Sequence, residues 1–206
     1  MTVRTFLAVA LLAPAVAFAA PASSPSKTAP AQQTYDSGVA VGGFVGYETA
    51  DVSGLSLRLD GEFPFKALSP QVRLSWVGSF GYSHLTTGSF AGGDFTANVF
   101  KFVPAARFTF PLAQQFSVTG DLGLGLAIVS ASINFPGVPG FIPGFTESHS
   151  SVNLMMRIGA GAWYDVNPKT RLGMMLEFDP IFGDFGFTGA SSQTTFLIQG
   201  GAMFKL

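Results

Sequence analysis

The sequence has no cysteine, few charges and, beyond its first residues, no long apolar run. The absence of cysteine excludes disulfides, thiolate metal ligands and thiol catalysis. Only 11% of the 206 residues are charged, against roughly 25% in an ordinary soluble domain. No internal run reaches the roughly 18 apolar residues of a transmembrane helix, which excludes a helical membrane bundle.

Charge and histidine content exclude further classes of protein. The formal net charge is −1 with scattered signs, so no basic face for nucleic acid is visible and no nucleic-acid partner is expected. Two histidines leave little for a metal cluster. We therefore expect no metal and no cofactor. What remains to be explained is a chain that is 48% hydrophobic and carries 25 glycines and 22 phenylalanines.

The N-terminal residues predict an export signal. Residues 1–19 combine the basic Arg4, the apolar Phe6–Val16 and a small-x-small site at Ala17-Phe18-Ala19, the pattern of a secretory signal peptide cleaved after Ala19. A transmembrane anchor is the alternative, but the run is too short and contains Pro14. Residues 20–35, rich in proline, alanine and serine, predict a flexible linker.

Residues 36–206 alternate between apolar and small or polar residues with a period of two, which predicts an all-β domain. The alternation and the turn residues between runs predict eight strands. Their expected ranges are about 37–48, 53–63, 70–84, 97–110, 116–132, 151–164, 171–179 and 194–206.

The charges separate the two faces of these strands. Every Arg, Lys, Asp and Glu within a predicted strand has the parity opposite to the aliphatic and aromatic row, so one face is purely apolar. A soluble sandwich has the same period, but its strands are typically about 5–6 residues long. A membrane-crossing strand needs roughly 9–11 residues. Compact connections at 64–69, 111–115 and 165–170 also alternate with longer ones, as in transmembrane barrels. The fold class is therefore an eight-stranded antiparallel up-and-down transmembrane β-barrel.

The C-terminus carries the most specific motif. The final residues, Gln199-Gly200-Gly201-Ala202-Met203-Phe204-Lys205-Leu206, match the assembly signal of small eight-stranded outer-membrane barrels, with Gln199, Gly201, Phe204 and Leu206 at its defining positions. At this level the chain resembles the barrels of the OmpA-transmembrane, OmpX and OmpW type. The resemblance implies the outer membrane of a Gram-negative-type bacterium, contact with outer-membrane lipid, and insertion by the outer-membrane assembly machinery.

Inward charges of a barrel this small are buried, so they should pair. When each compact turn is centred on its midpoint, every short hairpin carries one inward acid facing one inward arginine. The expected pairs are Asp60 with Arg73, Arg107 with Asp121, and Arg157 with Glu177. We predict that these ion pairs plug the lumen. The inward rows also include apolar residues, which leaves a partly apolar lumen open: Phe44, Val77, Val99, Val103, Met155, Met175, Leu197 and Met203.

The long connections are rich in phenylalanine. The segment 134–145 repeats proline and glycine between aromatic residues, and further phenylalanines follow in the next long connection. Exposed apolar patches indicate contact with lipid or a partner, whereas the alternative is that the rings cap the barrel mouth or form its interfacial girdle. The candidate contact residues are Phe135, Phe141, Phe145, Phe185 and Phe187.

Three functions follow from these observations. The leading hypothesis is a barrel with a side-chain-plugged lumen and a structural or surface-interaction role through its Phe-rich outer loops. The alternative is OmpW-like binding or passage of a small hydrophobic ligand. A second alternative, a lipid A-modifying enzyme, depends on His149 and Ser151 with Glu147 nearby, a His, hydroxyl and carboxylate combination. We expect a non-enzyme.

Overall fold

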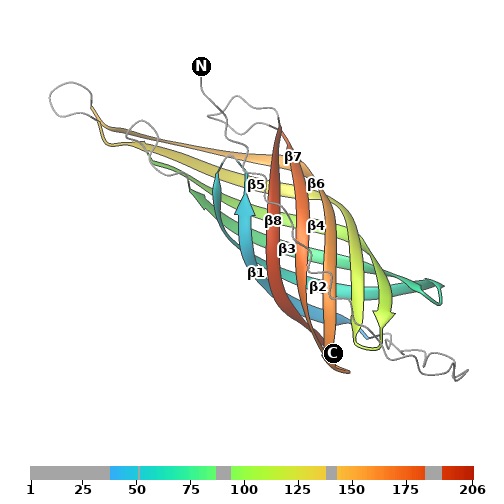
Figure 1. Ribbon diagram of the computed structural model, residues 1–206. Helices are drawn as coiled ribbons and strands as arrows, with labels where there is room; N and C mark the ends of the chain where they lie inside the picture. Colours follow the sequence, from blue (N-terminus) through green and yellow to red (C-terminus); the bar gives the residue numbers. More distant parts are fainter. Residues whose placement is uncertain (1–37, 51, 87–93, 138–142, 184–191) are drawn as a thin grey trace, which may run out of the picture. The chain divides into compact units, whose positions relative to one another are not determined.

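The computed structural model describes residues 38–50, 52–86, 94–137, 143–183 and 192–206, so the predicted signal peptide and linker lie outside the described residues. The described chain forms a closed barrel of antiparallel strands in chain order, with β1 paired to β8 (Figure 1). This confirms the predicted eight-stranded barrel. The strands are β1 (Ala40–Thr49), β2 (Ser53–Ser69), β3 (Val72–Thr86), β4 (Asp94–Ala113), β5 (Phe116–Phe135), β6 (Phe145–Asn167), β7 (Thr170–Phe182) and β8 (Ser192–Lys205).

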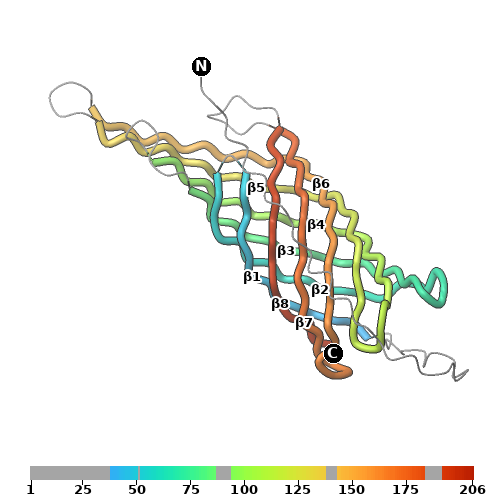
Figure 2. Tube along the Cα trace, viewed as in Figure 1, coloured from blue at the N-terminus to red at the C-terminus, as the bar shows by residue number. Residues whose placement is uncertain are grey.

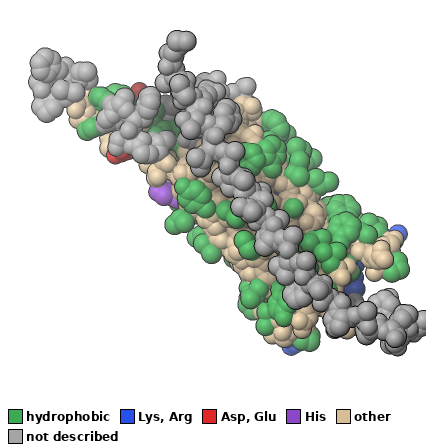
Figure 3. Space-filling view, in the orientation of Figure 1, with side chains coloured by type: hydrophobic (Ala, Val, Ile, Leu, Met, Phe, Trp, Pro, Cys, Tyr) green, Lys and Arg blue, Asp and Glu red, His purple; other side chains and the backbone are tan. Residues whose placement is uncertain are grey.

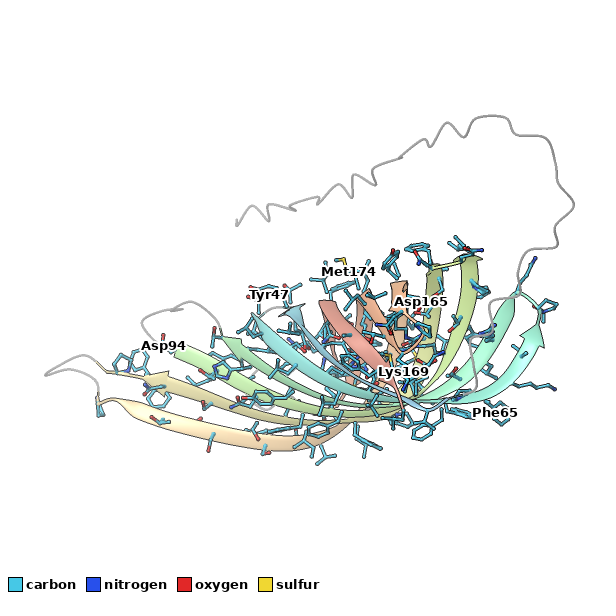
Figure 4. All side chains as sticks on the ribbon, turned by 90° about the horizontal axis from the view of Figure 1, so that it is seen from below. Tyr47, Phe65, Asp94, Asp165, Lys169 and Met174 are labelled. Carbon is cyan, nitrogen blue, oxygen red and sulfur yellow. The ribbon has the colours of Figure 1, made fainter. Side chains whose placement is uncertain are left out.

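The two ends of the barrel differ. At one end the strands are joined by tight turns at 70–71, 114–115 and 168–169, and β1 begins beside the end of β8 (Figure 2). At the other end three of the four connections are longer. Short turns mark the periplasmic side of membrane barrels, so we name these the inner and outer ends. Tyr47 and Asp94 lie toward the outer end, and Phe65 and Lys169 toward the inner end (Figure 4). None of the described residues belongs to a helix long and apolar enough to span a membrane.

Several strands extend beyond their predicted limits. β2 continues to Ser69 although Pro64 suggested an earlier end, because register shifts between Pro64 and Lys66 and between Ala67 and Ser69 keep the strand paired past the proline. Residues 133–135 and 145–150, expected in a connection, extend β5 and β6 into a paired hairpin. Residues 143–150 are exposed on both faces, so the alternation that marks a strand is absent there.

The barrel exterior is apolar on every strand. Large exposed hydrophobic side chains alternate outward, for example Val45, Leu57 and Leu124 with more than half of their surface exposed, and they cover much of the described surface (Figure 3). Exposure on this scale is unfavourable in water. In a bilayer the same surface faces acyl chains, and closure leaves no unpaired sheet edge in lipid. The exterior is therefore a lipid-facing belt.

Two prolines interrupt the hydrogen-bonded wall without changing its register. Between β4 and β5 the pairing passes from Phe102 opposite Leu126 to Ala105 opposite Gly123, skipping Pro104. Between β6 and β7 it skips Pro180 in the same way. Proline has no N–H to donate, so each site lacks a ladder hydrogen bond. Among the described strand pairs, these are the two interruptions that leave the register unchanged.

Candidate functional site

The inward face brings a set of buried charges together in the middle of the barrel. Among the described residues, ten ion pairs connect eleven inward side chains from six strands, each at most 5% exposed. We name this set the lumen network. Its members are Glu48, Arg58, Asp60, Glu62, Lys101, Arg107, Asp121, Arg157, Arg171, Glu177 and Asp179.

Arg107 is the centre of the inner half of the network. Its Nε and Nη2 donate to the two carboxylate oxygens of Asp121 at 2.9 and 2.7 Å. The same guanidinium lies 3.0 Å from Glu62 and 3.3 Å from Asp60. Arg171 pairs with Glu62 from the opposite wall. Because guanidinium has five donors in a planar fork, one arginine can serve three carboxylates at once.

Lys101 is the corresponding cation of the outer half. Its Nζ lies 2.6 Å from Glu48 Oε1 and 3.1 Å from Asp179 Oδ2. Arg157 binds Asp179 with two hydrogen bonds of 3.0 Å, from Nε and Nη2. The Nε of Arg157 is also 3.3 Å from Glu177. Each buried charge in this half thus has a charged partner, which offsets the cost of removing it from water.

Arg58 joins the two halves, because it pairs with Asp60 at 2.9 Å and with Glu177. The network is therefore continuous across the lumen. Six carboxylates and five cations leave it with a formal charge of −1, and hydroxyl groups add further donors to the carboxylates. Ser79 donates to Asp60 at 2.8 Å, and Ser83 donates to Glu48. Ion-paired side chains from six strands thus meet in the lumen.

An aromatic cluster packs against the arginines of the network. The rings of Phe44 and Trp163 meet edge to face with centroids 5.7 Å apart, and Trp163 Nε1 donates to Thr119 at 3.0 Å. The guanidinium of Arg171 lies 4.4 Å from the centroid of Trp163. Gly173 is opposite Trp163 in the register, and a Cβ there would come within 2.4 Å of the indole ring. Glycine at this position leaves room for the ring.

Toward the outer end the lumen is apolar along β3 to β7. The packed residues there are Leu85, Ala97, Val99, Val103, Ala127, Val129, Ala131, Met155 and Ile181, with Val52 and Phe95 against them. We name this set the outer apolar cluster. The eight apolar inward residues expected from the sequence are all buried, with at most 4% exposure. The lumen is thus partly apolar as well as charged.

One predicted ion pair is wrong. The register places Arg73 opposite Ala67 and Asp60 opposite Ser79, so the two side chains are six positions apart along β3, about 20 Å. The cause is the turn, which lies at 70–71 rather than within 64–69. The other two predicted pairs are brought together, since both lie next to turns whose positions the sequence marks correctly.

Six network members were not assigned as site residues from the sequence. Their signal was the parity of charge on each strand, which places them inward but does not pair them. They are Glu48, Arg58, Glu62, Lys101, Arg171 and Asp179.

The residues of the predicted assembly signal occupy different faces of β8. Gln199 is buried and donates to Ser56 Oγ at 3.1 Å, and a Cβ at Gly201 would come within 2.4 Å of the inward Phe44 ring. Phe204 faces outward with 50% exposure and Leu206 is 81% exposed. The motif thus combines inward packing with an outward aromatic ring, and its role in assembly stays a prediction.

Two of the candidate contact phenylalanines lie together on the outer hairpin. Phe135 and Phe145 are paired across β5 and β6, and their rings stack with centroids 5.6 Å apart. Both belong to strands rather than to a loop. The other three candidates, Phe141, Phe185 and Phe187, lie outside the described residues.

The two histidines lie at the outer end. His84 faces outward on β3, and His149 is on the exposed part of β6. Ser151, the candidate nucleophile, accepts a hydrogen bond of 2.9 Å from Asn153 Nδ2. Glu147 is two positions beyond His149 on the same exposed stretch of β6.

Comparison with known proteins finds likeness in structure. No family model matches the sequence, and no curated protein matches it. A major outer membrane protein of Thermus thermophilus is 16% identical with a TM-score of 0.55, over 82% of this chain and 98% of that one. Neisserial surface protein A is 15% identical with a TM-score of 0.50, over 82% and 96%. The Escherichia coli outer membrane protease OmpT is 11% identical with a TM-score of 0.51, over 75% and 64%. At these identities the likeness concerns the fold.

The closed barrel, its lipid-facing belt and these neighbours define the fold. The chain has the fold of the small eight-stranded outer-membrane β-barrels.

Proposed function

We propose that this protein is a non-conducting, non-enzymatic barrel. Its role is to hold the outer β5–β6 hairpin in a fixed position, where the hairpin contacts surface partners. The lumen network carries the proposal, because buried, ion-paired side chains from six strands meet in the lumen, as a side-chain plug requires. Removing charges from such a network is strongly unfavourable, so the plug is a permanent part of the fold.

The hairpin is suited to contact. Residues 143–150 are exposed on both faces, and cross-strand hydrogen bonds hold the arm together, with Ser130 and Ser150 hydroxyls 3.0 Å apart and Thr146 donating to Asn134 at 3.1 Å. The stacked rings of Phe135 and Phe145 place apolar surface on it. Aromatic side chains at the end of a stiff polar arm favour an apolar partner surface.

Conductance in planar lipid bilayers tests the plug. Purified protein should show no steady open-pore current, and the double variant R107S/R157S, with two large cations removed, should show a higher current than the wild type. Large, steady currents through the wild type would overturn the proposal.

Vesicle association tests the hairpin. Nanodiscs that carry the protein should associate with phosphatidylcholine vesicles more than empty nanodiscs do. The variant F135S/F145S should lose this additional association with vesicles, while T146A on the same hairpin should retain it. Equal association of both variants would contradict a contact role for the rings.

A second candidate function is binding or passage of a small hydrophobic molecule, as in OmpW-like barrels. The outer apolar cluster supports it, since Val103 and Met155 in this cluster lie beside the wall positions where Pro104 and Pro180 interrupt pairing. Native mass spectrometry of gently extracted protein would detect a co-purified hydrophobe in this case. A spectrum of protein alone would favour the plugged barrel with a contact role for its hairpin.

Catalysis on lipid A is the remaining alternative. Ser151 would need a base beside it to become a nucleophile, and its hydroxyl accepts a hydrogen bond from the Asn153 amide. We propose a non-enzymatic role because the lumen network, the most extensive polar cluster among the described residues, consists of paired charges. Lipid A acylation should be the same with and without overexpression, and a changed acylation pattern that S151A abolishes would establish the enzyme instead.

A further inference from the structure

The outer part of the barrel exterior carries a regular pattern of hydroxyl groups. Residues that face one another across strands β1 to β6 form outward rows, and the outermost complete row contains only serine and threonine. Its members are Thr49, Ser53, Thr86, Thr96, Ser132 and Ser148, each paired with the next in the register. We name it the hydroxyl row.

The next two rows inward change from polar to apolar. The row below the hydroxyl row contains Tyr47, Leu55, His84, Asn98, Ser130 and Ser150. The row below that contains Val45, Leu57, Tyr82, Phe100, Ile128 and Val152. Successive outward rows are about 7 Å apart along the strands. Within two rows, across β1 to β6, the exterior therefore changes from side chains that suit lipid acyl chains to side chains that form hydrogen bonds.

Hydrogen bonds organise the polar rows. Asn98 Oδ1 accepts from the Tyr82 hydroxyl at 2.8 Å and from His84 Nδ1 at 2.9 Å. The Tyr47 hydroxyl donates to Ser53 at 2.8 Å. Neighbouring strands lie about 4.8 Å apart, so the hydroxyls form an evenly spaced array held by a rigid sheet rather than by loops. Such an array is ready to bind without ordering a loop first.

The chemistry of these rows fits a neutral polyhydroxyl ligand. The hydroxyl row and the row below it contain no Asp, Glu, Lys or Arg. Phosphate recognition relies on Arg and Lys, and neither occurs in these two rows, while the exposed Asp94 stands in the next row outward. Hydroxyl and amide groups both donate and accept, as sugar hydroxyls require.

We propose that the hydroxyl row and the row below it bind the sugar portion of an outer-leaflet glycolipid. The acyl chains of the lipid lie against the apolar row, which is continuous with the lipid-facing belt, and its sugars lie against the hydroxyl array. The site recognises sugar hydroxyls rather than phosphate. The acyl chains of the ligand, anchored in the membrane, add the contact with the apolar row.

Nanodiscs provide the test. Wild-type protein and the variant T86V/T96V/S132A are compared in discs of phosphatidylcholine that contain increasing amounts of lipopolysaccharide, either intact or dephosphorylated, and bound glycolipid is measured by native mass spectrometry. Thr170→Val, an outward threonine at the inner end of β7, is the matched control. Heat-modifiable migration establishes that each variant is folded.

Both glycolipid forms should bind the wild type, and the triple variant should bind about tenfold or more weakly, since three hydrogen bonds are lost. Thr170→Val should bind as the wild type does. Equal binding by the folded triple variant would overturn the proposal, as would loss of binding on dephosphorylation. Soluble core oligosaccharide should bind far more weakly than the glycolipid, and equal binding would overturn the membrane-anchored part. If the triple variant does not fold, S132A alone is used, with an expected loss of about threefold.

Discussion

Replacing Arg107 with leucine tests the lumen network most directly. The side chain is fully buried and serves three carboxylates. Asp60 keeps Arg58 and Glu62 keeps Arg171 after the change, whereas both oxygens of Asp121 lose the donors that bind them. The variant therefore leaves one carboxylate buried without its principal partner.

The size of the effect follows from charge and burial. Two unit charges about 4 Å apart interact by about 4 kcal/mol at an effective dielectric constant of about 20. Breaking one side of a buried pair typically costs about 3–5 kcal/mol. We expect R107L to lower the free energy of unfolding by about this amount. The double variant R107L/D121L removes the stranded carboxylate and should regain at least half of the loss.

Equilibrium unfolding in urea, with the barrel folded in lipid vesicles, measures both variants. Tryptophan fluorescence is a suitable signal because the Trp163 ring centroid lies 5.5 Å from the guanidinium carbon of Arg107. A loss of less than about 1 kcal/mol for R107L, the range of a surface ion pair, would refute the reasoning. So would a double variant that is less stable than R107L.

Three further changes have defined outcomes. Gly173→Ala should lower stability by about 1–3 kcal/mol and alter the near-ultraviolet circular dichroism, because the added Cβ would meet the indole at 2.4 Å, whereas Gly78→Ala meets nothing within 4 Å and should be neutral. Phe145→Ala removes the stack on Phe135 and should speed amide exchange in the hairpin while global unfolding stays within about 0.5 kcal/mol. Phe204→Ala should reduce the heat-modifiable fraction in cells but leave refolding in detergent intact, and equal reduction in both would contradict an assembly role.

The alternation of residue types made the barrel predictable. Each strand needs one apolar row for lipid and one small or polar row for the lumen, so the face of each residue follows from parity, and the turn residues between the runs give the number of strands. The ends of the strands were harder to predict from the sequence. Pro64 looked like a boundary, but a register shift next to it keeps β2 paired as far as Ser69.

Only part of the network could be paired from the sequence. The position of a hairpin turn shows which residues are neighbours on adjacent strands, but it does not show which side chains meet across the lumen. Arg107 and Asp121 lie on adjacent strands beside a short turn, so their pairing follows from the turn position. Lys101 and Glu48 are 53 residues apart and meet across the interior, which depends on the tilt and curvature of the closed sheet. Arg58 and Asp60 share a face of one strand at a spacing of two, a local signal that was available.

The lumen network also constrains how the barrel enters the membrane. Its members come from β1, β2 and β4 to β7, so an open sheet that had inserted before closing would turn these charges toward acyl chains. A lysine or arginine at the bilayer midplane costs about 2–4 kcal/mol, and five of them would cost about 10–20 kcal/mol. Half-formed barrels are therefore disfavoured in lipid, and we predict that closure of the sheet and its insertion into the membrane are coupled.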